Sequence, residues 1–291
     1  MTSGLEEGPR LLVVGVGPDG AEVARLALGH GDDPSDLLSL HGWDVLRVRD
    51  VVRHPAGRPE LTMTFVVKPS CGPLRGAAPD SGRDHSRYDD DQAGLANRRI
   101  AGGDGVQGEV ALRHQRVAAY AVVTSSRGFL MTQFSARTGA QGQWGLPGGG
   151  LEPGEGPERA VLREVWEESG QLIEVSDLAL VATSRWVGVA PGGRLEDYHA
   201  VRVIYRAICP EPTEPVVHDV GGTTASAAWV LPADLDLLAL TSGWRSILHE
   251  VTRLGDGGAA VSDVVMAPDE ADGPDHHHED TDPDDPARPE P

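Results

Sequence analysis

A glycine-rich loop that leads into one well-delimited helix is the feature that most constrains how this chain folds. The sequence predicts a helix over Pro157–Ser169, because proline suits the first helical position and Glu158 places negative charge in the first turn. Gly170 suits the left-handed residue that ends a helix. An apolar stripe runs along the helix, formed by Ala160, Val161 and Val165. We therefore expect this helix to pack on a sheet, with the glycine loop beside it.

The same helix carries three carboxylates at spacings of three and four residues: Glu164, Glu167 and Glu168. This spacing places them on one helix face, where they repel one another unless a positive charge lies among them. Oxygen ligands on a rigid helix beside an open loop suit Mg²⁺ or Mn²⁺, ions that keep waters and bind phosphates. An acidic helix face is usually just solvated, so the spacing alone is a weak signal.

Arg163 is expected to point away from the carboxylate face. There it could form an ion pair with Glu155 and hold the preceding loop against the helix.

The whole segment resembles the signature of the Nudix hydrolases, Gly-x5-Glu-x7-Arg-Glu-(aliphatic)-x-Glu-Glu-x-Gly-(aliphatic). The positions that match in order and spacing are Gly149, Glu155, Arg163, Glu164, Val165, Glu167, Glu168 and Gly170. The departure is Gln171, which stands where the family usually has an aliphatic residue. Because that is a packing position, the departure leaves the expected metal ligands untouched.

The resemblance implies an α/β fold, a Nudix-type α/β/α sandwich with a mixed sheet. It implies a site in which Glu164, Glu167, Glu168 and the backbone carbonyl of Gly149 bind one or more Mg²⁺ or Mn²⁺ ions. The implied catalytic set consists of those three glutamates together with Arg163 and Glu155 as the supporting pair.

The implied reaction is hydrolysis of a pyrophosphate bond in a nucleoside diphosphate linked to another group, by a metal-activated water. Family members differ in the residue that acts as base; some use a carboxylate of the signature helix and others a later acid. The later candidates here are Glu196, Asp197 and Asp219. Two alternatives stay open: a non-catalytic nucleotide-binding or regulatory module, and an isoprenoid diphosphate isomerase, for which no companion cysteine motif is found.

Composition divides the 291 residues into four parts. They are a small α+β segment over 1–70, a Gly/Asp-rich linker over 71–114, the Nudix domain over 115–254 and a disordered acidic tail over 255–291. For residues 1–110 two hypotheses stand: a homodimer contact and a wall of the substrate pocket.

Expected elements follow from apolar periodicity and turn residues. Besides the signature helix, helices are predicted over Ala21–Leu28 and Trp244–Leu254. Strands are predicted over Leu11–Gly15, Trp43–Val52, Leu61–Val67, Val117–Thr124, Phe129–Phe134, Leu178–Trp186, His199–Ile208 and Ala225–Leu231.

A Gly-x-Gly-x-x-Gly match at Gly15–Gly20 could indicate a dinucleotide site. Such a site needs a strand–helix–strand unit with a parallel second strand, whereas the next strands look like a hairpin. We therefore interpret this segment as a strand followed by a tight turn.

The formal net charge is −20, and residues 255–291 supply more than half of it with twelve acidic residues against one arginine. Such acidity argues against nucleic-acid binding and against binding to anionic membranes. The partner that the resemblance implies is a small nucleotide derivative. Cys71 and Cys209 form no Cys-x-x-Cys pair, and no apolar stretch reaches membrane-spanning length. These features predict a cytoplasmic protein. His276–His278 in the tail is interpreted as incidental rather than a metal site.

Overall fold

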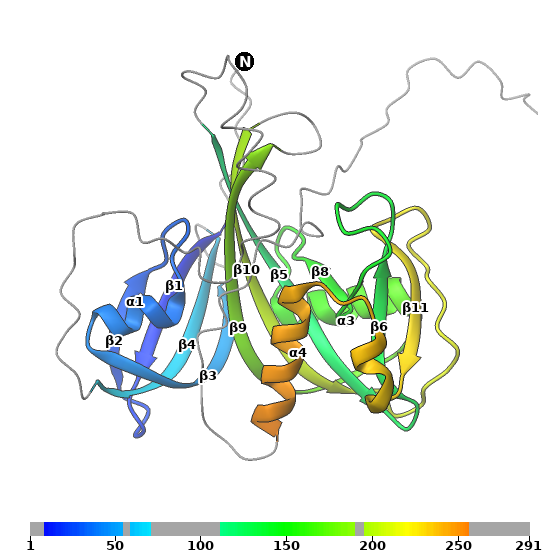
Figure 1. The fold of residues 1–291 in the computed structure, drawn as a ribbon. Coiled ribbons are helices and arrows are strands. Elements are labelled where there is room, and N and C mark those ends of the chain that lie inside the picture. Colours follow the sequence, from blue (N-terminus) through cyan, green and yellow to red (C-terminus); the bar gives the residue numbers. More distant parts are fainter. Residues whose placement is uncertain (1–8, 55–58, 71–110, 190–194, 256–291) are drawn as a thin grey trace, which may run out of the picture.

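The computed structural model describes residues 9–54, 59–70, 111–189 and 195–255, which form two β-sheets and the helices that pack on them (Figure 1). The predicted tail lies outside these residues except for Gly255, which ends a helix, and so do its histidines. Most of the predicted linker also lies outside them, but Leu112–His114 at its end belong to a strand. In the described part of the chain, no helix is long and apolar enough to cross a membrane.

The first sheet has four strands in the order β2-β1-β4-β3, with β1 and β4 parallel and the other neighbours antiparallel. Its elements are β1 (Arg10–Val16), β2 (Glu22–Ala27), the short helix α1 (Pro34–Leu40), β3 (Trp43–His54) and β4 (Glu60–Pro69). The predicted β3–β4 hairpin is confirmed.

The predicted helix over Ala21–Leu28 is wrong, because this segment contains β2. Gly20 has φ +83°, and the amide of Gly17 donates to the carbonyl of Ala21, so the chain reverses tightly and pairs back onto β1. The helix propensity of this segment is overridden by the sheet pairing. The absence of a crossover helix here also confirms that Gly15–Gly20 is a strand and a tight turn.

The second sheet has seven strands, with the order β11-β6-β5-β10-β9 and with β7 and β8 paired to β6 and β5. Its strands are β5 (Leu112–Ser125), β6 (Gly128–Phe134), β7 (Trp144–Gly145), β8 (Gly148–Gly150), β9 (Glu174–Val189), β10 (Leu195–Ile208) and β11 (Thr224–Val230). The strand β10 is parallel to β5 and antiparallel to β9, which makes the sheet mixed.

Helices cover both faces of this sheet, because alternate residues of β5 pack on different helices. Val117, Ala119 and Ala121 belong to the same buried cluster as the apolar stripe of α3 (Pro157–Ser169). Ala118, Tyr120 and Val122 belong to the cluster formed with α4 (Ser242–Gly255), which follows the 3-10 helix η2 (Pro232–Leu237). The predicted α/β/α sandwich with a mixed sheet is confirmed.

The four-stranded sheet packs on the α3 side of the larger sheet and shares its hydrophobic core. Its buried residues, which include Leu61, Met63 and Phe65, belong to the same cluster as Val201 and Val203 of β10. In Figure 1 the smaller sheet lies beside β9 and β10, and β3 contacts both β9 and α3. The N-terminal sheet therefore supports the same face of the large sheet as the signature helix.

Candidate active site

The signature helix has the ends that the sequence predicts. It runs from Pro157 to Ser169, and Gly170 follows it in the left-handed conformation with φ +68°. The apolar stripe is buried against the sheet, so the opposite face is available for polar chemistry.

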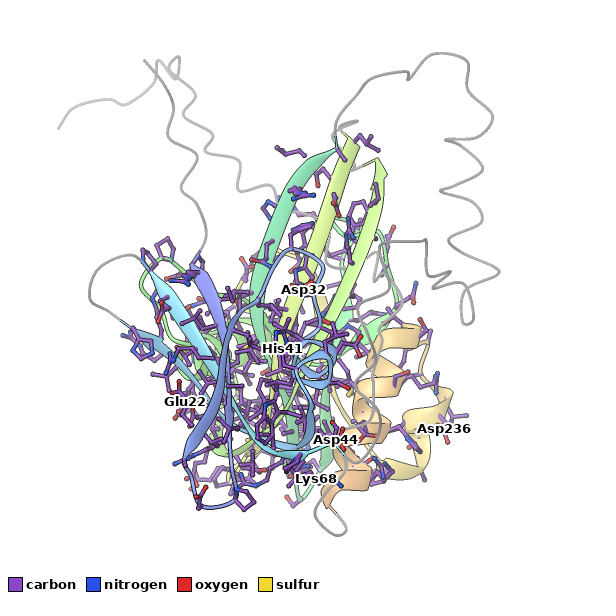
Figure 2. The ribbon with its side chains drawn as sticks, turned by 90° about the vertical axis from the view of Figure 1, so that its left-hand side faces the viewer. Glu22, Asp32, His41, Asp44, Lys68 and Asp236 are labelled. Atoms are coloured by element: carbon purple, nitrogen blue, oxygen red, sulfur yellow. The ribbon has the colours of Figure 1, made fainter. Side chains whose placement is uncertain are left out.

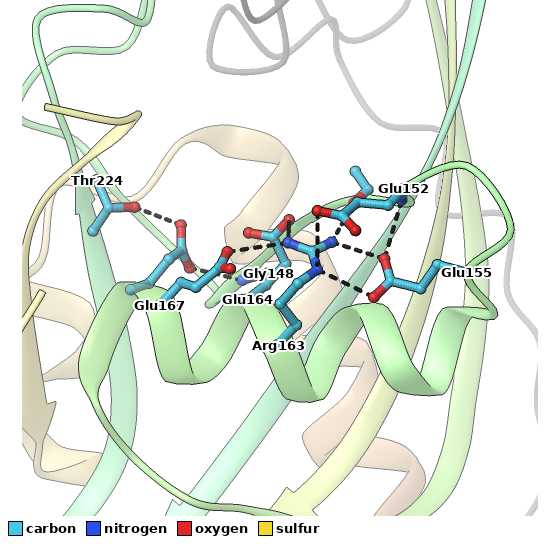
Figure 3. Close-up of polar contacts among 9 residues, drawn as sticks. Gly148, Glu152, Glu155, Arg163, Glu164, Glu167 and Thr224 are labelled. Carbon is cyan, nitrogen blue, oxygen red and sulfur yellow. Dashed lines mark hydrogen bonds and ion pairs between the residues drawn. The ribbon is translucent and has the colours of Figure 1, made fainter. Parts of the chain in front are cut away.

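The predicted pair of Glu155 and Arg163 is formed, and it holds the loop to the helix (Figure 3). Arg163 Nε lies 3.1 Å from Glu155 Oε1, and Nη2 lies 2.8 Å from Oε2. Nη2 also donates to the carbonyl of Gly150 at 3.0 Å. Burial opposes ionisation of Glu155, but the guanidinium outweighs it and keeps the pKa of Glu155 below its ordinary value. The loop is thus fixed by a charge-assisted bidentate contact.

The expectation that Arg163 points away from the carboxylates is wrong. Its Nη1 donates to Glu164 Oε1 at 2.8 Å and to Glu167 Oε2 at 3.1 Å, as Figure 3 shows. A long guanidinium can reach both sides of a helix ridge, so one end binds the loop and the other the acidic face. Arg163 is therefore a positive charge among the carboxylates.

Glu168 is the most deeply buried of the three carboxylates, with 7% of its surface exposed. It accepts hydrogen bonds from the backbone amide of Gly148 at 2.9 Å and from the hydroxyl of Thr224 on β11. Both donors are neutral. Burial, followed by the nearby charge of Glu164, raises the pKa of Glu168 to about 8. Burial also raises the pKa of Glu164, and Arg163 only partly opposes this.

Gly149 is a glycine because the Glu164 carboxylate occupies the space of a side chain. A Cβ at Gly149 would lie 2.6–2.7 Å from the carboxyl atoms of Glu164. The backbone of β8 consequently lies directly against the Glu164 carboxylate.

These groups suit a divalent cation by their chemistry. Several carboxylate oxygens and a neighbouring backbone segment are gathered in a buried setting that disfavours their negative charge. Among the described residues, no group of three or more acidic, histidine or cysteine side chains already has the geometry to hold a metal ion. The guanidinium of Arg163 instead bridges Glu164 and Glu167.

Two site residues lie outside the signature, and the sequence analysis missed them. Thr224 reaches Glu168 from β11, and Arg116 of β5 lies beside the loop. A Cβ at Gly150 would lie 2.7 Å from the Arg116 guanidinium. The charge of Arg116 also offsets a small part of the rise that burial causes in the pKa of Glu164. Both residues lie on strands far from the signature in the sequence. The sequence gives no signal for Thr224, and for Arg116 it gives only the alternation of side chains along β5.

The structure separates the three later acids proposed as bases. Asp219 lies in the loop between β10 and β11; its amide donates to the carbonyl of Glu167 at 3.1 Å, and its charge contributes to the raised pKa of Glu168. Asp197 instead pairs with Arg185 at 2.7 and 2.8 Å, which holds the pKa of Asp197 at about 2. Glu196, its neighbour, points to the opposite face of β10.

The unusual Gln171 is buried and has polar partners. Its carbonyl oxygen accepts from the amide of Thr213 at 2.9 Å, and its nitrogen donates to the carbonyl of Ser169 at 3.1 Å. The glutamine thus ties the end of α3 to the loop that carries Asp219, where an aliphatic side chain could only pack.

Comparison with known proteins agrees with this geometry. Residues 114–251 match the family model described as NUDIX domain. The nucleoside triphosphatase NudI of Salmonella schwarzengrund (strain CVM19633) is 29% identical over 137 residues, 46% of this chain and 94% of that protein. The solved structure of a MutT NUDIX hydrolase from Burkholderia pseudomallei is 29% identical, covers 47% of this chain and 98% of its own, and has a TM-score of 0.38.

The NUDIX domain of Shewanella oneidensis NrtR, solved with ADP ribose, is 19% identical with a TM-score of 0.38, over 54% of this chain and 96% of that one. The sequence matches carry the assignment. Residues 114–251 are therefore a Nudix domain.

Proposed function

We propose that this chain hydrolyses a pyrophosphate bond in a nucleoside diphosphate linked to another group, with Mg²⁺ as the cofactor and Mn²⁺ as a substitute. The observation that carries the proposal is the state of Glu168. It is a buried carboxylate with only neutral hydrogen-bond donors, and the charge of the neighbouring Glu164 further opposes its ionisation. Such an arrangement costs stability unless a cation compensates it.

Glu164, Glu167, Glu168 and the backbone of Gly149 would hold the cation. When bound, a divalent ion supplies an activated water and neutralises charge that develops on the phosphoryl group. The Glu155–Arg163 pair fixes the loop, and Arg116 places a further positive charge beside Gly150, where a substrate phosphate can be bound.

Two carboxylates are candidates for the base. Glu168 has a pKa of about 8, which suits proton transfer near neutral pH. Asp219 lies close enough to affect that pKa, and its loop is anchored on the carbonyl of Glu167. Asp197 is a poor candidate, because Arg185 neutralises it.

The test is the Glu168→Gln variant, assayed on a panel of nucleoside diphosphate derivatives and nucleoside triphosphates with Mg²⁺ or Mn²⁺. We expect turnover to fall about a thousandfold while the fold is retained. The matched control is Glu158→Gln, an exposed glutamate in the first turn of the same helix, for which the rate should be unchanged. An unchanged rate in Glu168→Gln would contradict the proposal.

The non-catalytic binding module is the second candidate. If the wild-type protein binds nucleotides but releases no phosphate-bearing product with either metal, this alternative replaces the hydrolase.

A further inference from the structure

Three aromatic rings stand in a row across the central strands of the large sheet. His114 on β5 stacks on Tyr198 of β10, with ring centroids 5.3 Å apart and an interplanar angle of 18°. Trp186 of β9 stacks on the other side of Tyr198, with centroids 5.7 Å apart and an angle of 25°. We call His114, Tyr198 and Trp186 the ring row. Figure 1 shows that these three strands extend beyond α3 and α4.

The ring row lies on the same face of the sheet as Arg116 and close to it. His114 and Arg116 are two residues apart on β5, so their side chains share a face and their Cα atoms are about 7 Å apart. Arg116 in turn lies against Gly150 of the catalytic loop. A nucleotide whose phosphates are bound at the loop therefore has the ring row within reach of its base.

A buried carboxylate borders the ring row. Glu196 has 9% of its surface exposed, and no residue that the structure describes hydrogen-bonds its Oε2. Glu196 lies near enough to His114 for its charge to offset part of the lowering that burial causes in the pKa of His114. On β9 its paired residue is Gly188, and the Trp186 ring leans over that glycine, 3.1–3.2 Å from where a Cβ would stand.

A buried acceptor without a donor lowers stability, so it needs an explanation. The described helices supply no donor to Oε2, and Glu196 is the second residue of β10, where it is paired with Leu112 and Gly188. A ligand that brings its own N–H group would satisfy Oε2.

We propose that the ring row and Glu196 form the base-recognition site of this enzyme, and that Glu196 selects bases with an exocyclic amino group. The base stacks on the outer face of Trp186 at the end of the row, because Tyr198 is buried between Trp186 and His114. Oε2 of Glu196 accepts a hydrogen bond from the amino group, as acidic side chains do with cytosine N4. A base with a carbonyl at that position presents lone pairs to the carboxylate and is rejected.

This inference rests on the proposed function only for the location of the phosphates, and binding measurements test it without turnover. The probes are ADP against IDP and CDP against UDP, pairs in which an oxo group replaces the amino group. We expect the wild-type protein to bind the amino member at least about tenfold more tightly, and Glu196→Ala to reduce that ratio to about one. The control is Glu174→Ala, an exposed glutamate of β9 that should leave the ratio unchanged.

Two further measurements separate recognition from a structural role. Because the carboxylate is buried without a donor, Glu196→Ala should leave the melting temperature unchanged or raise it, whereas a structural residue would lower it. Trp186→Ala should weaken both members of each pair about tenfold without changing the ratio, and Trp166→Ala, an exposed tryptophan on α3, should weaken neither.

The inference is overturned if the wild-type protein binds both members of each pair equally, binds none of the four, or keeps its preference in Glu196→Ala. Unchanged binding by Trp186→Ala overturns the stacking role. If hydrolysis is absent but the binding preference holds, the proposed function fails and the base-recognition site stands.

Discussion

Two buried acidic sites in this protein are held in opposite electrostatic states. Glu168 receives only neutral donors, from Gly148 and Thr224, and its pKa rises to about 8. Asp197 receives two hydrogen bonds from Arg185 and lies 3.0 Å from His30, and its pKa falls to about 2. Burial is similar, at 7% and 6% exposed. Burial raises the pKa of both carboxyls and is the leading cause at Glu168, whereas at Asp197 the Arg185 guanidinium outweighs it.

Each state suits a different task. Asp197 joins the large sheet to the N-terminal segment that contains His30 and Asp32. The backbone of Asp32, which Figure 2 labels, hydrogen-bonds His199. Thr183 also donates to Asp33 at 2.7 Å. Because Arg185 neutralises Asp197, this carboxylate stabilises the junction without a bound cation. No cationic side chain hydrogen-bonds Glu168, so its ionised form is left for a bound cation to stabilise.

The largest effect on stability that follows from this comparison is the response to metal. Mg²⁺ at about 100 times its dissociation constant should raise the free energy of unfolding by about 2.7 kcal/mol, because it binds only the folded state. Glu164→Gln should remove this gain, and Asp197→Asn should keep it. Thermal unfolding with EDTA and with Mg²⁺ measures both. An equal metal response in wild type and Glu164→Gln would contradict the ligand assignment.

A smaller effect concerns the structural pair. The pKa of Asp197 is depressed from its ordinary 3.8 to about 2, so its stabilisation is present above pH 4 and is lost as the pH falls from about 4 to 2. Asp197→Asn should cost about 2 kcal/mol at pH 7 and should flatten this acid limb of the stability curve. Urea unfolding from pH 2 to pH 7 checks the prediction; an unchanged acid limb in the variant would show that Asp197 does not carry it.

The smallest effect concerns a direct contact from the N-terminal sheet to the loop before the signature helix. Arg53 of β3 donates to the backbone carbonyl of Glu155 at 3.2 Å. Arg53→Ala should cost about 1 kcal/mol of stability and reduce turnover only severalfold, since the Glu155–Arg163 pair remains. Arg47→Ala, an exposed arginine on the same strand, is the matched control. Equal effects from both variants would mean that the contact has no specific role.

The sequence predicted the signature helix and its neighbours well, because their signals are local. Pro157, Gly170 and the apolar stripe set the limits and the buried face of α3, and the spacing of the signature placed Glu155 within reach of Arg163. The segment Ala21–Leu28 misled the prediction, since its helix propensity is weak compared with pairing to β1. The helix α1 was missed although Asp33 caps it and Pro34 begins it.

What the sequence determined by itself is the set of groups that share one helix face and the loop that precedes them, because helical periodicity and turn chemistry act over a few residues. Only the tertiary structure decided which distant groups meet them: Thr224 on Glu168, Arg116 beside Gly150, and Arg163 between two carboxylates. It also decided that the adjacent residues Glu196 and Asp197 have separate environments, since side chains alternate across a strand and the packing of each face depends on elements far away in the chain.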